Sequence, residues 1–276
     1  MKESEIKKVV RKGYAEIAKK SSSCCATPSC CGGSADPALD ISKAIGYSDE
    51  EMTSVPEGAN LGLGCGNPVA LASLAEGETV LDLGSGAGFD CFLAANKVGS
   101  RGKVIGVDMT PEMIDKAREN ARNGNYENVE FRLGEIENIP AADNSVDAVI
   151  SNCVINLAPD KKRVFNETFR VLKPGGRLMV SDIVLLKELP DFVRESVAAY
   201  IGCVSGAMMK DDYLEAMREA GFNQVKIIDE TSFPIDCMAS DPTAQVIIKE
   251  MNLPADKIEE VASSVASIKV QGIKPG

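Results

Sequence analysis

The chain has 276 residues, 44% of them hydrophobic, and a formal net charge of −11 at pH 7, so it can bury a substantial core beneath an acidic surface. An acidic surface repels phosphate backbones, no apolar run approaches the ~20 residues of a membrane helix, and the charged N-terminus lacks the apolar segment of a secretory signal. These features argue against a nucleic-acid partner, a membrane span and secretion, and we expect a cytoplasmic protein that acts as a monomer.

Residues 1–75 are expected to form an N-terminal extension. Residues 2–20 have the apolar spacing of an amphipathic helix with basic residues on its other face, and we expect this helix to pack on a neighbouring element. A stretch dominated by Ser, Gly and Pro follows at residues 21–34 and is typical of a mobile loop. Residues 36–75 combine polar turns with short helical patches.

Strands and helices alternate regularly from residue 78 onwards. The helix expected after Thr110 has a clear start, because Thr favours the capping position and Pro111 the first helical position. The expected strands are 79–83, 103–107, 129–133, 146–151 and 177–184, and the expected helices are 89–98, 111–123 and 161–172. This alternation predicts an α/β fold with a doubly wound, mostly parallel sheet and right-handed crossovers.

The last third of the chain is less regular. We expect helices at 190–200, 211–220 and 241–264, and strands at 224–229 and 267–273 that complete a seven-stranded sheet. The predicted organisation is therefore an N-terminal helix and Cys-rich segment at 1–75, a cofactor-binding domain at 76–185, and a smaller C-terminal α+β region at 186–276.

The strongest local signal is the glycine-rich turn at residues 82–88 (DLGSGAG), where the first strand leads into a helix. Glycine lets the backbone approach a ligand closely at a helix N-terminus, in the crevice at the carboxyl ends of the strands. The G-x-G-x-G spacing departs from the G-x-G-x-x-G of dinucleotide sites, which disfavours NAD. A simple tight turn is the alternative interpretation. Asp108 favours a ligand, because a carboxylate at the end of the second strand can accept both hydroxyls of a ribose.

Two further segments extend this pattern, residues 134–136 (GEI) after the third strand and residues 172–176 (LKPGG) before the fifth. With them, residues 75–185 resemble the class I methyltransferases, which implies S-adenosylmethionine as the cofactor. The residues implied to bind it are Asp82, Gly84, Ser85, Gly86, Gly88, Asp108, Met109, Glu135, Ile136 and Asn152.

The resemblance also implies individual roles. The glycines of the turn and Asn152 would face the methionine part of the cofactor, and Asp82 would contact its amino end directly or through water. Met109 and Ile136 would enclose the adenine, and Glu135 would face its exocyclic amine.

The chain has nine cysteines but no histidine, so the commonest general base and metal ligand is missing. In a reducing compartment, cysteines serve more often as ligands or catalysts than as structural disulfides. Two vicinal pairs, Cys24-Cys25 and Cys30-Cys31, lie in the loop at 21–34. We interpret Cys91 and Cys237 as small buried fillers.

Cys65, Cys153 and Cys203 have more informative surroundings. Glycines next to Cys65 and Cys203 favour exposed, adaptable backbone over packed core. Cys153 follows the fourth strand, at the edge where a class I methyltransferase presents its acceptor. Spacing alone also allows three ordinary buried thiols, or a zinc site, although the chain offers neither a C-x-x-C pair nor a histidine to support zinc.

The sequences around these three cysteines are similar to those of the arsenite methyltransferases, and the resemblance spans the chain from about Cys30 to the C-terminus. The segments that carry it are residues 64–68 (GCGNP), 152–157 (NCVINL), 202–207 (GCVSGA) and 211–213 (DDY). It implies that Cys153 and Cys203 bind As(III), with Cys65 as third thiol and redox partner. Cys30 or Cys31 would supply a fourth family cysteine.

The implied chemistry suits these residues. Soft thiolates select thiophilic ions, and trivalent arsenic takes three ligands and keeps a lone pair that can attack a methyl group without a general base. Two thiols, Cys65 with Cys30 or Cys31, would then reduce pentavalent arsenic by forming a disulfide. Turnover would need thioredoxin or glutathione, and arsenite would arrive as a thiol conjugate. A methyltransferase for a small organic acceptor and a non-catalytic thiol protein that sequesters metalloids are the alternatives.

Overall fold

The computed structural model describes residues 3–20, 37–194, 196–232 and 260–276. The loop expected at 21–34 and most of the helix expected at 241–264 lie outside these residues. So do the cysteines Cys24, Cys25, Cys30, Cys31 and Cys237.

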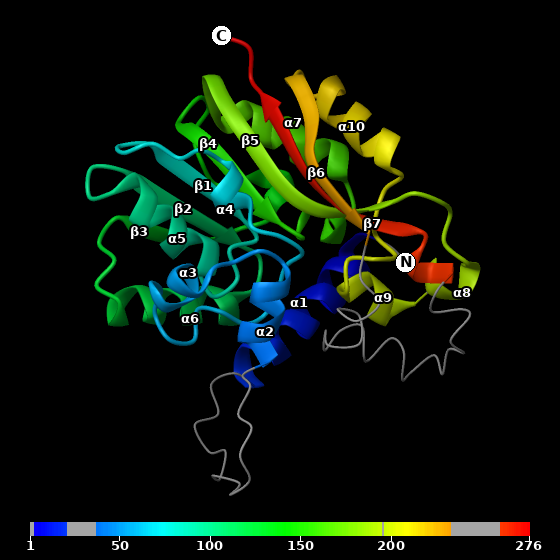
Figure 1. The fold of residues 1–276 in the computed structure, drawn as a ribbon, viewed down its shortest axis with the longest axis horizontal. Coiled ribbons are helices and arrows are strands. Elements are labelled where there is room, and N and C mark those ends of the chain that lie inside the picture. The colour runs from blue at the N-terminus through cyan, green and yellow to red at the C-terminus, as the bar shows by residue number, and fades with distance from the viewer. Residues whose placement is uncertain (1–2, 21–36, 195, 233–259) are drawn as a thin grey trace, which may run out of the picture.

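One sheet of seven strands forms the centre of the described structure, in the order β3-β2-β1-β4-β5-β7-β6 (Figure 1). The strands are β1 (Thr79–Leu83), β2 (Lys103–Asp108), β3 (Val129–Leu133), β4 (Val146–Asn152), β5 (Leu172–Leu185), β6 (Asn223–Ser232) and β7 (Val265–Ile273). The first five strands pair in parallel, whereas β7 runs antiparallel to both β5 and β6. The prediction of a doubly wound, mostly parallel seven-stranded sheet is confirmed.

The described helices and strands follow the predicted pattern with two differences. They are α1 (Glu3–Lys20), α2 (Pro37–Ala44), α3 (Asp49–Thr53), α4 (Pro68–Leu71), α5 (Phe89–Val98), α6 (Pro111–Asn123), α7 (Lys161–Val171), α8 (Asp191–Arg194), α9 (Val197–Ile201) and α10 (Lys210–Glu219), with 3-10 helices η1 (Ile136–Asn138) and η2 (Ile155–Leu157). The helix expected at 190–200 is two short helices, α8 and α9. β5 begins five residues earlier than expected, because Leu172 already pairs with Val146, before an irregularity in β5 that shifts the register to the Ala148–Arg177 pair.

Alternate side chains of the strands enter two separate cores, as the period-two geometry of a strand requires. On one face, Leu81 and Val107 pack in a cluster with buried residues of α7 and α10. On the other face, Val80 and Val104 pack with buried residues of α5 and α6. The sheet is therefore covered by helices on both sides, which leaves its carboxyl edge as the place for a ligand.

A third cluster gathers beside the end of β5, and it includes Cys65 and Cys203. Helix α1 contributes Val10 to it and contacts α6 and α9, as expected for a helix that packs on its neighbours. β7 pairs with β5 from Arg177 to Leu185, so the sheet continues across the predicted boundary at residue 185. The division of the chain into three regions stays a prediction. No helix in the described ranges has both the length and the apolarity of a membrane span.

Candidate active site

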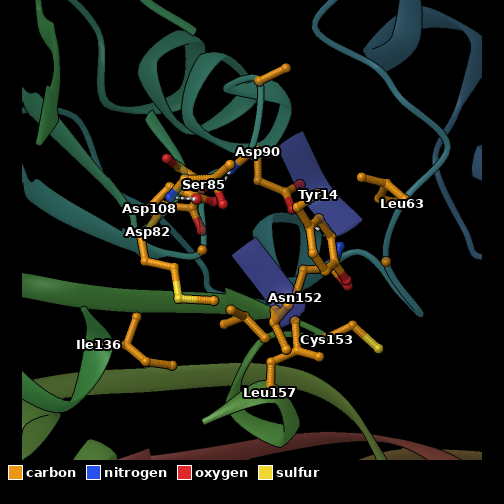
Figure 2. Close-up of a pocket in the computed structure, with 18 of the residues that line it drawn as sticks. Tyr14, Leu63, Asp82, Ser85, Asp90, Asp108, Ile136, Asn152, Cys153 and Leu157 are labelled. Carbon is orange, nitrogen blue, oxygen red and sulfur yellow. Dashed lines mark hydrogen bonds between the residues drawn. The ribbon is translucent and has the colours of Figure 1, made fainter. Parts of the chain in front are cut away.

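A cavity of about 1020 Å³, its open mouth included, lies where the glycine-rich turn meets the carboxyl ends of β1, β2 and β4 (Figure 2). The predicted cofactor residues that line it are Asp82, Gly84, Ser85, Gly86, Asp108, Met109, Ile136 and Asn152. Gly88 and Glu135 do not line it. Figure 2 shows Asp82, Ser85 and Asp108 together on one side of the cavity and Cys153 with Leu157 on another.

The backbone of the turn takes conformations that favour glycine. Gly84 has φ +69° and lies so close to Val154 that an added Cβ would come within 2.4 Å of it. Gly88 has φ +98°, and its missing Cβ would meet Phe92 and Phe131 at 2.7 and 2.8 Å. Gly88 therefore serves the close packing at the start of α5 rather than the cavity wall.

Asp108 holds the turn in place from the end of β2. Its two carboxylate oxygens accept hydrogen bonds from the Gly86 N–H at 3.1 Å and the Thr110 N–H at 2.8 Å. Burial raises the pKa of Asp108, whereas these backbone donors lower it. A carboxylate oriented in this way suits the proposed contact with ribose hydroxyls.

Two more buried carboxyl groups form part of the cavity wall. Asp82 accepts the Cys91 thiol at 3.2 Å, and burial followed by the charge of Asp90 raises its pKa well above the ordinary value. Burial raises the pKa of Asp90 to about 6, although hydrogen bonds from Tyr47 and Asn152 oppose the shift. A ligand with a positive ammonium or sulfonium group would find acceptors here.

The Asp90 side chain should make stability depend on pH in a defined direction. Its folded pKa of about 6 exceeds the unfolded value of ~3.9, so the folded state binds this proton more tightly. The stabilising contribution is full below pH ~4 and is lost as pH rises through about 6. The free energy of unfolding, measured by urea unfolding, should fall between pH ~4 and about 6 in the parent protein. We expect this fall to be smaller in Asp90→Asn. Equal pH slopes in the two proteins would contradict the assignment.

Several cavity residues escaped the sequence analysis. Asn60 is one of them, and its Oδ1 accepts the Ser42 hydroxyl at 3.0 Å and the Gly62 N–H at 2.9 Å. These two donors fix the amide so that its Nδ2 remains buried without a partner among the described residues, as does the Ser85 hydroxyl. Buried polar groups without a partner are costly, so both atoms are suited to bind a polar ligand. Asn60 belongs to no glycine-rich or cysteine motif, which explains why sequence reasoning missed it.

Helix α1 contributes Lys7, Val10 and Tyr14 to the cavity wall. The Lys7 ammonium lies 2.7 Å from Glu135 and 3.0 Å from Glu137. Glu135, expected to face an adenine amine, is therefore paired with α1, whereas Glu137 lies at the cavity wall. The predicted cofactor residues all lie at position 82 or later, so the contribution of α1 to the cavity wall was not predicted from the sequence.

Lys7→Ala should weaken cofactor binding, because it removes the cation that holds α1 to η1 and leaves the buried Glu137 unpaired. We expect the dissociation constant for S-adenosylmethionine to rise about three- to tenfold, which corresponds to ~0.7–1.4 kcal/mol. Lys19→Ala is the matched control on the same helix, since the Lys19–Glu112 pair is mostly exposed and worth little. Isothermal titration calorimetry would measure both, and equal effects would exclude a specific role for Lys7.

The three predicted arsenic ligands converge beside this cavity. The Sγ atoms of Cys65 and Cys153 and a carboxylate oxygen of Asp182 all lie within 4.8 Å of one another. The Cys203 thiol donates to the Cys153 carbonyl at 2.8 Å and also interacts with the Cys153 thiol. Hydrogen bonds that the protonated Cys153 thiol makes to the Cys203 and Cys65 sulfurs, together with burial, raise the pKa of Cys153 well above that of an ordinary thiol.

The expected exposure of Cys65 and Cys203 is wrong, because their exposed fractions are only 6% and 4%. The glycines around Cys65 serve close approach instead of mobility. A Cβ on Gly64 would lie 2.7 Å from the Asn152 amide nitrogen, and one on Gly66 would collide with the Ser181 hydroxyl. The Cys65 segment thus lies directly on the ends of β4 and β5.

Hydrogen bonds fix the Cys65 segment at both of its backbone groups. The Cys65 N–H donates to Asn152 Oδ1 at 3.0 Å, and the Cys65 carbonyl accepts the Ser267 hydroxyl at 2.8 Å. The Asn152 amide also donates to the Gly66 carbonyl at 2.8 Å and to Asp90 at 3.1 Å. Asn152 therefore joins the cofactor cavity to the thiol cluster.

Cys153 and Cys203 both have left-handed backbones, with φ +58° and +62°. Such values are uncommon for residues other than glycine and asparagine, and they persist only where the surrounding structure imposes them. Strained backbone of this kind concentrates at functional sites. Cys91, by contrast, is fully buried within α5 and bonded to Asp82, and Cys30 and Cys31 lie outside the described residues.

Comparison with known proteins agrees with this geometry. Residues 74–221 match the methyltransferase domain family. The arsenite methyltransferase of Halobacterium salinarum is 53% identical over 231 residues, 81% of this chain and 59% of that protein. The human arsenite methyltransferase is 32% identical over 237 residues, 83% of this chain and 61% of that protein.

A solved structure gives the same relationship. The crystal structure of CrArsM, an arsenic(III) S-adenosylmethionine methyltransferase from Chlamydomonas reinhardtii, matches with a TM-score of 0.64 at 33% identity, over 88% of this chain and 75% of that one. The chain spans about three fifths of the length of the two curated relatives above. The domain match covers more than half of the chain, and the structural relative exceeds 30% identity over most of its own length. The chain therefore belongs to the methyltransferase domain family and, within it, to the arsenite methyltransferases.

Proposed function

We propose that this protein transfers methyl groups from S-adenosylmethionine to trivalent arsenic held by Cys65, Cys153 and Cys203. The observation that carries the proposal is the convergence of these thiols at the wall of the cavity. Cys153 belongs to the thiol cluster and also lines the cavity. The activities named for the relatives support it.

The cavity residues fit the proposed cofactor. Asp108 would accept the ribose hydroxyls, and the unpartnered Ser85 hydroxyl and Asn60 amide would hydrogen-bond to polar groups of the ligand. The buried Asp82 and Asp90 would face its positive end. When bound, S-adenosylmethionine supplies an electrophilic methyl group on a sulfonium centre. We propose these residues as the cofactor contacts, together with Met109 and Ile136 against the adenine.

The thiols suit the uptake of arsenite in its neutral form. The raised pKa of Cys153 keeps this thiol protonated before arsenite binds. Neutral As(OH)₃ exchanges its three hydroxides for three thiols and releases three waters, each formed from one hydroxide and one thiol proton. No base is needed for this exchange, and none is needed for attack by the arsenic lone pair. Alignment of the lone pair with the methyl group at ~3–3.5 Å can remove roughly 7–11 kcal/mol of the barrier.

Methyl transfer raises the formal oxidation state of arsenic from III to V. We propose that the thiol of Cys30 or Cys31 attacks the arsenic-bound sulfur of Cys65. The disulfide forms as the As–S bond breaks, the electron pair of that bond stays on arsenic and returns it to the trivalent state, and the attacking thiol releases one proton. Thioredoxin or glutathione would then reduce the disulfide. All of the proposed residues come from one chain, so we propose a monomer as the functional unit.

The test combines arsenite, S-adenosylmethionine, a thiol reductant and the purified protein, with chromatographic separation of methylated arsenicals. We expect methylated arsenic and one demethylated cofactor for each transferred methyl group. Turnover with an organic acceptor but not with arsenite would favour the small-molecule alternative. Arsenite binding without cofactor consumption would favour a sequestering protein.

A further inference from the structure

A buried carboxyl group lies beside the thiols, and the proposed reaction does not use it. Asp182 on β5 has no exposed surface, and one of its oxygens lies within 4.8 Å of the Sγ atoms of both Cys65 and Cys153. Trivalent arsenic takes three ligands, and the three thiols supply them. Arsenic bound by three thiols therefore does not need a carboxylate at this position. Together with the three thiols, however, the carboxylate makes a set of four donors.

Hydrogen bonds hold this carboxylate in a fixed orientation. Its Oδ1 accepts the Asn156 amide at 2.8 Å and the Ile183 N–H at 2.9 Å, and its Oδ2 accepts the Tyr213 hydroxyl at 3.1 Å. An oxygen carries two lone pairs, so Oδ2 keeps one after binding Tyr213. Metal-binding carboxylates are commonly oriented by outer hydrogen bonds of this kind.

The dimensions of the cluster suit a small tetrahedral cation. Zinc binds sulfur at ~2.3 Å and carboxylate oxygen at ~2.0–2.2 Å, so two sulfurs in a regular tetrahedron lie ~3.8 Å apart. The present limit of 4.8 Å for Cys65, Cys153 and Asp182 requires only a small contraction. Cys203 lies outside this group of three, but its thiol donates to the Cys153 carbonyl at 2.8 Å, which places it beside Cys153 as the candidate for the fourth donor.

Lys161 is half-buried at the start of α7. Burial lowers its pKa, and the charges of Asp182 and Cys203 oppose that shift. Lys161 also donates to the Ala158 carbonyl at 3.0 Å, which fixes its position at the start of α7. The donor set is therefore soft, anionic when ionised, and partly compensated.

We propose that Cys65, Cys153, Cys203 and Asp182 form a site for a thiophilic divalent cation of the Zn²⁺ and Cd²⁺ class, which excludes arsenite when bound. On binding, the cation loses its waters, and each thiol that coordinates it releases a proton to solvent. The cation has no lone pair to accept a methyl group, so it inhibits. This inference rests on the proposed function in that it uses the same three thiols, but it concerns a ligand that is never methylated.

Co²⁺ is the probe, because thiolate coordination in a tetrahedral site gives it strong visible and near-ultraviolet bands. The titration uses the reduced full-length chain with Cys24, Cys25, Cys30 and Cys31 replaced by serine, since these thiols could bind the same ion. We expect one Co²⁺ for each chain, and we expect arsenite to displace it in proportion. Arsenite binding is measured separately by equilibrium dialysis.

Asp182→Asn is the discriminating variant, because it keeps the shape of the side chain and removes the anionic ligand. We expect it to lower the ratio of Co²⁺ affinity to arsenite affinity at least tenfold, whereas Cys153→Ser lowers both affinities. An unchanged ratio would overturn the role of Asp182. If Asp182→Asn fails to fold, the competition between Co²⁺ and arsenite is measured in the chain that carries only the four N-terminal serine substitutions. Failure of arsenite to displace Co²⁺ from that chain would overturn the proposal that the two ligands share one site. Co²⁺ binding without arsenite binding would instead refute the proposed function and leave the cation site standing.

Discussion

Replacing Cys153 with serine is expected to lower kcat/KM for arsenite methylation by at least about 10³-fold, a loss of ~4 kcal/mol of transition-state stabilisation. The reason is that a hydroxyl is a hard, weakly acidic donor that cannot replace a thiol on a soft, thiophilic centre. Arsenic held by two thiols would also lose the fixed direction of its lone pair, and alignment supplies much of the rate. Cys203→Ser should behave in the same way.

Cofactor binding separates this effect from a general loss of structure. Cys153 lines the cofactor cavity, but serine has nearly the same shape, so we expect the dissociation constant of S-adenosylmethionine to change less than about threefold. Cys91→Ser is the matched control, because it makes the same substitution at a fully buried thiol outside the cluster, and its hydroxyl can still donate to Asp82. Methylation that survives in Cys153→Ser with normal cofactor binding would remove Cys153 from the proposed site.

The sequence predicted the sheet and the cofactor cavity well because local sequence patterns determine both. Apolar runs of five or six residues followed by a 3.6-residue period give the strands and helices, and the turn at 82–88 opens onto the cavity. Local patterns say little about what packs over a site. Lys7 and Asn60 reach the cavity from segments without a motif, and only tertiary packing brings them there.

The error over Cys65 and Cys203 has a similar cause. A glycine beside a cysteine permits two opposite outcomes, mobile backbone at the surface or unusually close packing in the interior. Around Cys65 the second outcome holds, since Gly64 and Gly66 let the chain lie on Asn152 and Ser181. Asp182 was missed for a related reason, because an aspartate inside a strand gives no sign of the thiols that arrive from distant segments.

Asn152 explains how the two halves of the site can be held in one geometry. Its amide hydrogen-bonds to the Cys65 N–H and the Gly66 carbonyl on one side and to Asp90 on the other. A displacement of this amide would therefore move both the Cys65 segment and the wall of the cavity. A thiol that binds arsenic must be placed accurately relative to the cofactor, since a misplacement of ~1 Å can cost about 10²-fold in rate. Disturbing Asn152 without changing any ligand is therefore a direct test of the arrangement.

Gly64→Ala makes that disturbance, and we expect it to lower kcat for arsenite methylation about 10²-fold or more. The new Cβ would lie 2.7 Å from the Asn152 nitrogen and 2.8 Å from its Cγ and Oδ1, with Asn152 already fixed by four hydrogen bonds. Relief of the overlap must move the amide or the Cys65 segment. Overpacking of this kind also costs ~1–3 kcal/mol of stability, which urea unfolding would measure.

Gly46→Ala supplies a matched control for backbone strain. Gly46 has φ +105°, close to the +116° of Gly64, but nothing lies within 4 Å of its would-be Cβ. Both variants therefore carry the cost of a side chain at positive φ, and only Gly64→Ala collides with Asn152. If the two variants lose similar stability and similar methylation rate, strain alone accounts for the loss and Asn152 has no special part. A selective loss of rate in Gly64→Ala means that the position of Cys65 relative to the cofactor limits the reaction.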